Sequence, residues 1–162
     1  MKITSRRILK RWQNTKTNRI MAEEKKIAVY YTKPIVAVGE VQPGSYVYDG
    51  DAELCYVDEE YHLHSYAIEK WVSKDTPVFP ITLETTRIME KMAAVRNKWH
   101  KANIMNANFS RELTSALYDL MAIDVYDEEY GKKEDAIWNS IEERYQEMVE
   151  HAKALGIFRG KD

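Results

Sequence analysis

The sequence predicts an α+β fold, in which an N-terminal antiparallel β-sheet or SH3-like small barrel is followed by a three-helix C-terminal region. Two patterns lead to this prediction. Residues 26–81 hold short runs of β-branched and aromatic residues separated by turn residues, whereas residues 82–162 repeat apolar residues at steps of three and four. A chain of 162 residues with 44% hydrophobic and 31% charged side chains is ordinary for globular protein. Residues 1–25 are set apart as a basic arm, and the helical region is expected to pack with the β module.

The β module is expected to contain short strands joined by tight turns. Strands are predicted at 27–31, 35–41, 45–48, 51–57 and 61–66, with a turn at 42–44. The clearest signal is Asp49-Gly50, because Asp-Gly tolerates the positive φ angles of a type I′ turn and so predicts a two-residue hairpin.

Alternation along the strands assigns side chains to two faces if Glu59 and Glu60 form the following turn. The face expected in the core holds Ala52, Leu54, Tyr56, Tyr61, Leu63 and Ser65. The face expected toward solvent holds Glu53, Cys55, Val57, His62 and His64. In this register Cys55 lies opposite His64.

Three amphipathic helices are predicted after Thr82, which is placed to cap the first of them. Their apolar stripes are Ile88, Met92, Val95, Trp99 and Ala102, then Leu113, Leu117, Leu120 and Met121, then Ile137, Ile141, Tyr145, Met148, Ala152 and Leu155. Such stripes are buried against one another, against the sheet or against a second copy of the chain. No apolar run approaches the roughly 20 residues of a membrane span, so no membrane partner is expected.

The net charge of -2 results from blocks of opposite sign that cancel. Residues 1–20 carry seven bases and no acid, and residues 34–69 carry eight acids and neither Lys nor Arg. Residues 84–111 hold six bases and two acids, whereas residues 112–150 hold twelve acids and three bases. Such blocks either keep faces solvated or create local fields that steer charged partners.

The basic arm allows three interpretations. It fits a segment that contacts nucleic acid or an acidic partner, a transit peptide that lacks acids, or an extension ahead of a start at Met21. It lacks the apolar stretch of a secretory signal. The single cysteine excludes an intrachain disulfide and favours a reducing, cytoplasmic setting.

The sequence carries no high-specificity catalytic motif, so an enzyme is not expected. Residues with the spacing of a calcium loop are Asp49, Asp51, Glu53 and Glu60. Leu54 stands where that loop needs glycine, and strands replace the flanking helices, so a plain hairpin is preferred.

Cys55, His62 and His64 form a candidate Zn²⁺ site, because a thiolate and imidazoles on one strand face are zinc ligands. The alternative is an ordinary solvent face, since a shift of one residue in the register separates Cys55 from the histidines. Apart from this metal, no cofactor is expected.

The charge blocks suggest two binding surfaces. An acidic surface that imitates the phosphate charge of nucleic acid would use Asp58, Glu59, Glu60, Asp124, Asp127, Glu128 and Glu129 to bind a partner protein. A basic surface that binds nucleic acid directly would use Arg6, Arg7, Lys10, Arg11, Arg87, Lys91 and Lys98.

The run from Asp75 to Thr85, which follows a Tyr-Asp-Gly hairpin and precedes a predicted helix, resembles small accessory proteins of Gram-positive bacteriophages and prophages. The resemblance covers about residues 26–92 and carries over no functional residue. Many such phage proteins are non-enzymatic binders of host machinery, including inhibitors of CRISPR nucleases. The resemblance therefore implies an inhibitor of this kind.

The leading expectation is a non-enzymatic protein-binding module encoded by a phage or mobile element. It would inhibit a host nucleic-acid enzyme, of the CRISPR-nuclease type, by covering its nucleic-acid-binding surface in the bacterial cytoplasm. One alternative is a small nucleic-acid-binding regulator that uses the basic arm and the first C-terminal helix. The other is a zinc-binding module. The partner's identity and the oligomeric state are not predicted.

Overall fold

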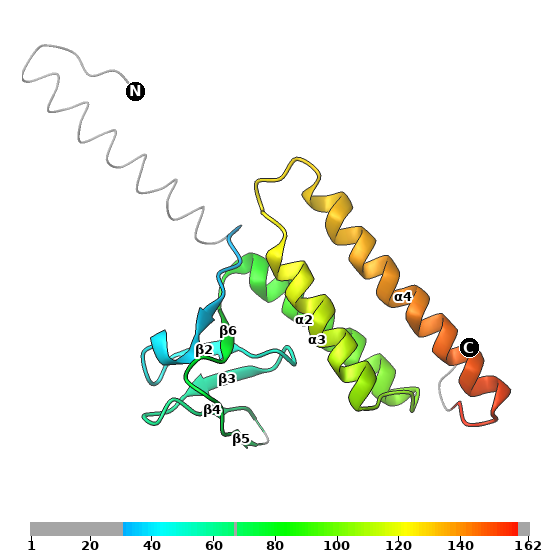
Figure 1. Ribbon diagram of the computed structural model, residues 1–162, viewed down its shortest axis with the longest axis horizontal. Helices are drawn as coiled ribbons and strands as arrows, with labels where there is room; N and C mark the ends of the chain where they lie inside the picture. The colour runs from blue at the N-terminus through cyan, green and yellow to red at the C-terminus, as the bar shows by residue number, and fades with distance from the viewer. Residues whose placement is uncertain (1–30, 67, 159–162) are drawn as a thin grey trace, which may run out of the picture.

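The computed structural model describes residues 31–66 and 68–158, and in these residues it confirms the α+β prediction (Figure 1). A six-stranded antiparallel sheet precedes three helices. The strands are β1 (Val36–Ala37), β2 (Tyr46–Tyr48), β3 (Leu54–Val57), β4 (Leu63–His64), β5 (Glu69–Lys70) and β6 (Pro77–Pro80). The helices are α2 (Leu83–Lys101), α3 (Ala107–Ala122) and α4 (Tyr130–Ala154). The basic arm and most of the predicted strand at 27–31 lie outside the described residues, and Tyr31 itself is helical.

The sixth strand lies between the first two, which gives the order β1-β6-β2-β3-β4-β5. Val36 pairs with Val78 on one side of β6, and Val47 pairs with Pro80 on the other. The sequence did not predict β6 because it begins and ends with proline, which argues against an interior strand. The strand predicted at 35–41 is shorter than expected, because a 3₁₀ turn, η1 (Val38–Glu40), follows β1.

Two hairpin loops of the same design join β2 to β3 and β3 to β4. In the first, Asp49 Oδ1 accepts hydrogen bonds from the backbone N–H groups of Asp51 and Glu53 at 2.9 and 3.0 Å, and Ala52 has a φ of 61°. In the second, Asp58 Oδ1 accepts from Glu60 N–H and His62 N–H at 2.8 and 2.9 Å, and Tyr61 has a φ of 63°. Each aspartate thus satisfies the backbone of its own loop, as in an Asx turn.

These loops are longer than the two-residue turns predicted, so the predicted faces are wrong for β3, whereas Leu63 on β4 is buried as predicted. A type I′ turn at Asp49-Gly50 would pair Tyr48 with Asp51, whereas Tyr48 pairs with Leu54. A shift by an odd number of residues inverts the two faces of a strand. Cys55 and Val57 are therefore fully buried.

The sheet has a core of its own on the face that contains Cys55. Its buried members are Val38, Val47, Cys55, Val57, Leu63 and Val78, all from the β module. No residue of α2, α3 or α4 belongs to this cluster. The sheet therefore curves over its own apolar side chains, as expected for a small module of short strands.

The helices form as the sequence predicts. Thr82 caps α2, since its side chain accepts a hydrogen bond from Thr85 N–H at 3.1 Å, and Asn106 caps α3 in the same way. The stripe on α2 is buried around Trp99, whose ring contacts both Phe109 and Tyr145 at centroid distances of 6.2 Å. Leu155 of the predicted third stripe is exposed, because it follows the end of α4.

The sheet docks on the helices through the end of its other face. Phe79 on β6 is fully buried in the helical core, and its ring lies 5.6 Å from that of Tyr118 on α3. Tyr48, which pairs with Phe79, packs beside it. The remainder of this face extends beyond the helices and is open.

Candidate functional site

The open part of the sheet carries a row of aromatic side chains, which we call the aromatic row: Tyr46, Tyr56 and His64. These residues are direct cross-strand neighbours on β2, β3 and β4. The ring of Tyr56 stacks on His64 at 4.6 Å with an interplanar angle of 8° and meets the edge of Tyr46 at 6.2 Å. Tyr46 is 58% exposed and neighbouring Leu54 is 48% exposed. Side chains of this size exposed together on one face are typical of binding surfaces.

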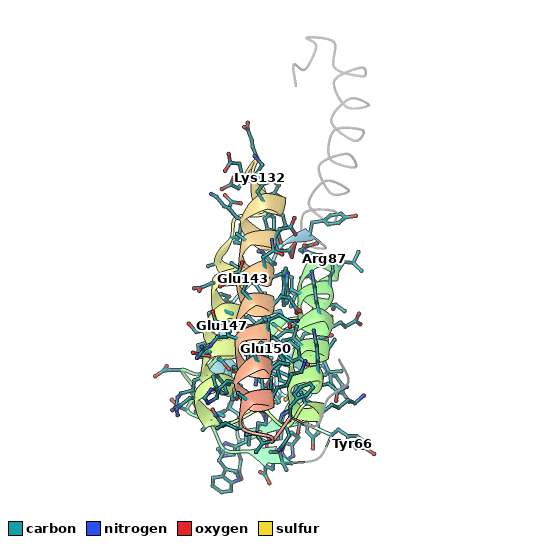
Figure 2. All side chains as sticks on the ribbon, turned by 90° about the vertical axis from the view of Figure 1, so that its right-hand side faces the viewer. Tyr66, Arg87, Lys132, Glu143, Glu147 and Glu150 are labelled. Carbon is teal, nitrogen blue, oxygen red and sulfur yellow. The ribbon has the colours of Figure 1, made fainter. Side chains whose placement is uncertain are left out.

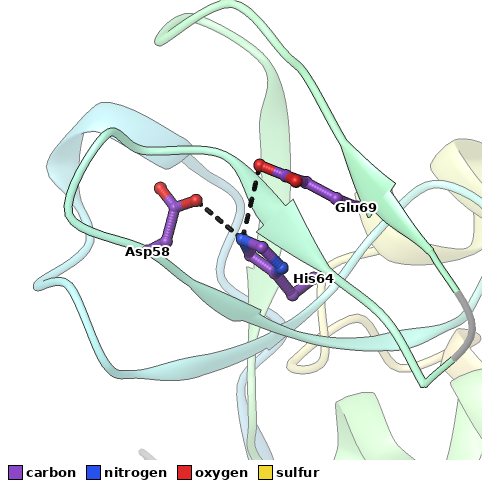
Figure 3. A group of neighbouring side chains, drawn as sticks. All are labelled: Asp58, His64 and Glu69. Carbon is purple, nitrogen blue, oxygen red and sulfur yellow. Dashed lines mark hydrogen bonds and ion pairs between the residues drawn. The ribbon is translucent and has the colours of Figure 1, made fainter.

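The row ends in a cluster of three potential metal or proton ligands, Asp58, His64 and Glu69 (Figure 3). His64 Nε2 lies 2.7 Å from Asp58 Oδ2 and 3.7 Å from Glu69 Oε1. Glu69 on β5 is the cross-strand partner of His64. Hydrogen bonds from His62 N–H and from His64 lower the pKa of the Asp58 carboxyl. The cluster therefore presents an ionised carboxylate at neutral pH.

The structure does not bring together the predicted zinc ligands Cys55, His62 and His64. The Cys55 thiol lies in the core of the sheet, 3.7 Å from Asp49 Oδ2, and burial together with the Asp49 carboxylate raises its pKa to about 12. His62 stacks on the ring of Trp71 at 4.6 Å, and its Nδ1 accepts a hydrogen bond from Val72 N–H. Only His64 of the three belongs to a ligand cluster among the described residues. The pairing of β3 with β4 is shifted by one residue from the predicted register, so that Tyr56 and not Cys55 lies opposite His64. This shift, the alternative considered from the sequence, separates Cys55 from the histidines.

The calcium-like residues of the first hairpin do converge, but they converge on a lysine. Lys70 Nζ lies 2.5 Å from Asp49 Oδ2, 3.5 Å from Asp51 and 3.3 Å from Glu53. Burial opposes the charge of Lys70, yet the hydrogen bond and the charge of Asp49 raise its pKa. The ammonium group thus takes the place a metal ion would need.

The bases predicted to bind nucleic acid from α2 are engaged within the molecule. Arg87 pairs with Glu84 and, at 2.5 Å, with Glu134 on α4. Lys91 Nζ lies 4.6 Å from the ring centroid of Trp138, also on α4. Lys98 lies 3.2 Å from Glu142 Oε2 and 4.1 Å from the ring centroid of Tyr145.

The basic block of α2 and the acidic block of α4 therefore neutralise each other in part, along the contact between the two helices. The other predicted bases, Arg6, Arg7, Lys10 and Arg11, lie outside the described residues.

The seven acids predicted to bind a partner do not form one surface. Asp58, Glu59 and Glu60 lie on the β3–β4 loop, next to the aromatic row. Asp124, Asp127, Glu128 and Glu129 lie on the loop between α3 and α4, at the top of the helices in Figure 1 and away from the sheet. In the second group Asp127 pairs with Lys133.

A further acidic row was missed in the sequence, where it lay within a long acidic block. Figure 2 shows Glu143, Glu147 and Glu150 along α4, and all three are exposed. Their spacing of four and three residues, the helical repeat, was the available signal. Arg144 and Lys153 pair with two of them, at 3.2 and 3.9 Å.

Lys33 is a buried charge that no pattern in the sequence singled out. Its Nζ donates a hydrogen bond to the carbonyl oxygen of Leu120 at 2.6 Å and lies 4.5 Å from the ring centroid of Tyr130. Burial lowers its pKa to about 8. These contacts fix the segment before β1 against α3 and α4.

Comparison of the chain with protein-family models, with curated proteins and with solved structures finds no match. None of the helices in the described part of the chain has the length and apolar character that crossing a membrane requires.

Proposed function

We propose that this chain is a non-enzymatic protein-binding module, whose binding surface is the aromatic row together with the acidic loop at Asp58, Glu59 and Glu60. The observation that supports the proposal is the exposed row of Tyr46 and Tyr56 beside these carboxylates. Tyrosine is enriched among residues that dominate binding energy, because a large rigid ring loses little entropy on binding. The acids beside it favour a basic partner surface.

A basic surface of this kind is what a nucleic-acid enzyme uses to hold phosphates. We therefore propose that the module covers the nucleic-acid-binding surface of a host enzyme. The resemblance to phage accessory proteins adds the expectation that the enzyme is a CRISPR-type nuclease in the bacterial cytoplasm. The intramolecular pairing of Arg87 and Lys98 with α4 weakens the alternative of a nucleic-acid-binding regulator, which then depends on the basic arm.

The test is a pull-down from lysate of the bacterial host with the full chain as bait, after nuclease treatment. Support requires three results: recovery of a nucleic-acid enzyme, competition of that binding by added DNA or RNA, and loss of binding in the double variant Tyr46→Ser/Tyr56→Ser. The matched control is Tyr126→Ser, since Tyr126 is 72% exposed but lies in the α3–α4 loop.

Two outcomes would contradict the proposal. Equal loss of binding in the control variant and the double variant would show that the aromatic row is not the surface that binds the partner. A salt-sensitive mobility shift with bare DNA, abolished when Arg6, Arg7, Lys10 and Arg11 are neutralised, would favour the regulator instead.

A further inference from the structure

The cluster of Asp58, His64 and Glu69 contains the donor atoms of a transition-metal site. Imidazole nitrogen and carboxylate oxygen are ligands for Zn²⁺ and similar divalent ions. The three ligand atoms lie within 4.8 Å of one another. They come from the end of β3, from β4 and from β5, so the sheet holds them at neighbouring positions (Figure 3).

The spacing of the ligand atoms suits a metal ion. Two ligands bonded to zinc at about 2.0–2.2 Å in a tetrahedral site lie roughly 3.3 Å apart. The separations from His64 Nε2, which are 2.7 Å to Asp58 and 3.7 Å to Glu69, fall on either side of that value. Movements of less than about 1 Å would bring each carboxylate oxygen to that distance from His64 Nε2.

The ligands are oriented before any ion binds. Asp58 Oδ1 is occupied by two backbone N–H groups of its loop, which directs Oδ2 toward His64. The stacked ring of Tyr56 fixes the plane of the His64 imidazole. Supporting contacts of this type raise metal affinity by holding the first ligands in place.

The charge of the cluster also distinguishes it from the acidic group around Lys70. There, an ammonium group already bridges Asp49, Asp51 and Glu53. In the described part of the chain, the ion pairs of Asp58 and Glu69 are both with His64. Two carboxylates therefore share one imidazole, and a divalent cation would compensate the remaining negative charge.

We propose that Asp58, His64 and Glu69 bind a divalent transition-metal ion of the zinc type, with solvent completing its coordination. This site shares only His64 with the zinc ligands predicted from the sequence. The site overlaps the proposed partner-binding surface at Asp58 and His64, but Zn²⁺ binding is measured on the chain alone, so the two proposals are tested separately.

The experiment titrates the full purified chain, freed of metal, with Zn²⁺ at pH 7 by calorimetry. We expect one ion per chain, and at least about 100-fold weaker binding in His64→Ala and in Glu69→Gln, since losing a ligand costs more than losing a supporting contact. Glu69→Gln leaves the Asp58 loop untouched, so it remains informative if His64→Ala folds poorly. The matched control is His62→Ala, a neighbouring histidine outside the cluster, which should bind Zn²⁺ as the wild type does.

A second measurement identifies the ligand atoms. The Co²⁺-loaded protein should show ligand-field absorption from nitrogen and oxygen ligands without a thiolate-to-metal charge-transfer band. Three results would each overturn the proposal: wild type that binds Zn²⁺ no more tightly than His64→Ala, an equal loss in His62→Ala, or a thiolate band from Cys55. Failure here leaves the partner-binding test unaffected, since that test uses Tyr46 and Tyr56.

Discussion

The thiol of Cys55 should be almost inert in the native protein. It is fully buried in the core of the sheet, and burial together with Asp49 raises its pKa from the ordinary 9.0 to about 12. Since only the thiolate reacts, the reactive fraction at pH 8 falls about 1,000-fold from this shift alone, before restricted access is considered. Labelling by a disulfide reagent such as DTNB should therefore be at least that much slower than in the unfolded chain.

The assay is simple because the chain has one cysteine. Absorbance of the released thiol is followed in buffer and in denaturing urea, with free cysteine as the reference. Labelling that tracks the unfolded population as urea is added would agree with the structure. Native protein that reacts at the rate of the unfolded chain would refute the reasoning, because it would place Cys55 on the solvent face and restore the two-residue turn at Asp49-Gly50.

Three other predictions concern stability, measured by urea unfolding. Trp99→Ala should lower the free energy of unfolding by about 3–5 kcal/mol, since Trp99 is 1% exposed at the centre of the helical core; a loss below 1 kcal/mol would contradict that placement. Lys70→Met should lower the free energy of unfolding by about 2–3 kcal/mol, because the carboxylates of Asp49, Asp51 and Glu53 lose their cation in a partly solvated site. Millimolar Ca²⁺ should then stabilise Lys70→Met but not the wild type, and an equal response of both proteins would argue against the lysine as the internal cation. The folded state holds the pKa of Asp58 below its ordinary value of about 3.9. The ionised carboxylate therefore adds to the free energy of unfolding above pH 4, and this stabilisation is lost as the pH falls through the folded pKa. The gap in urea midpoint between wild type and Asp58→Ala should therefore narrow from pH 7 to pH 2, and a constant gap would show that the charge is irrelevant.

The helical half of the fold could be predicted because its signals are local and redundant. The stripe through Ile88, Met92 and Trp99 repeats over several turns, and Thr82 marks the start of α2. The strands were harder, since they are as short as two residues. Their faces depended on the loops at Asp49 and Asp58, in each of which a single aspartate accepts two backbone hydrogen bonds and converts a two-residue turn into a longer one. The alternation of side chains along the strands does not show whether the shorter turn or the longer loop forms.

The candidate site was predicted only in part, for the same reason. The acids of the Asp58 loop were identified from charge, and His64 from its residue type. Glu69 could not be assigned to the same cluster, because β5 was not predicted and the pairing of Glu69 with His64 exists only in the folded sheet. The partners of Arg87 and Lys98 on α4 were likewise invisible, since they depend on how the helices pack.

The place of β6 between β1 and β2 has a consequence for how the chain folds. Strands β2 to β5 pair with their neighbours in sequence, so they can form early from local contacts. The sheet remains open along β2 until β6 is synthesised and inserted, which leaves an unpaired edge during translation. Because α2 begins at Leu83, directly after β6 ends at Pro80, closing that edge also brings the first helix to the sheet. We expect docking of the helices to begin at this junction.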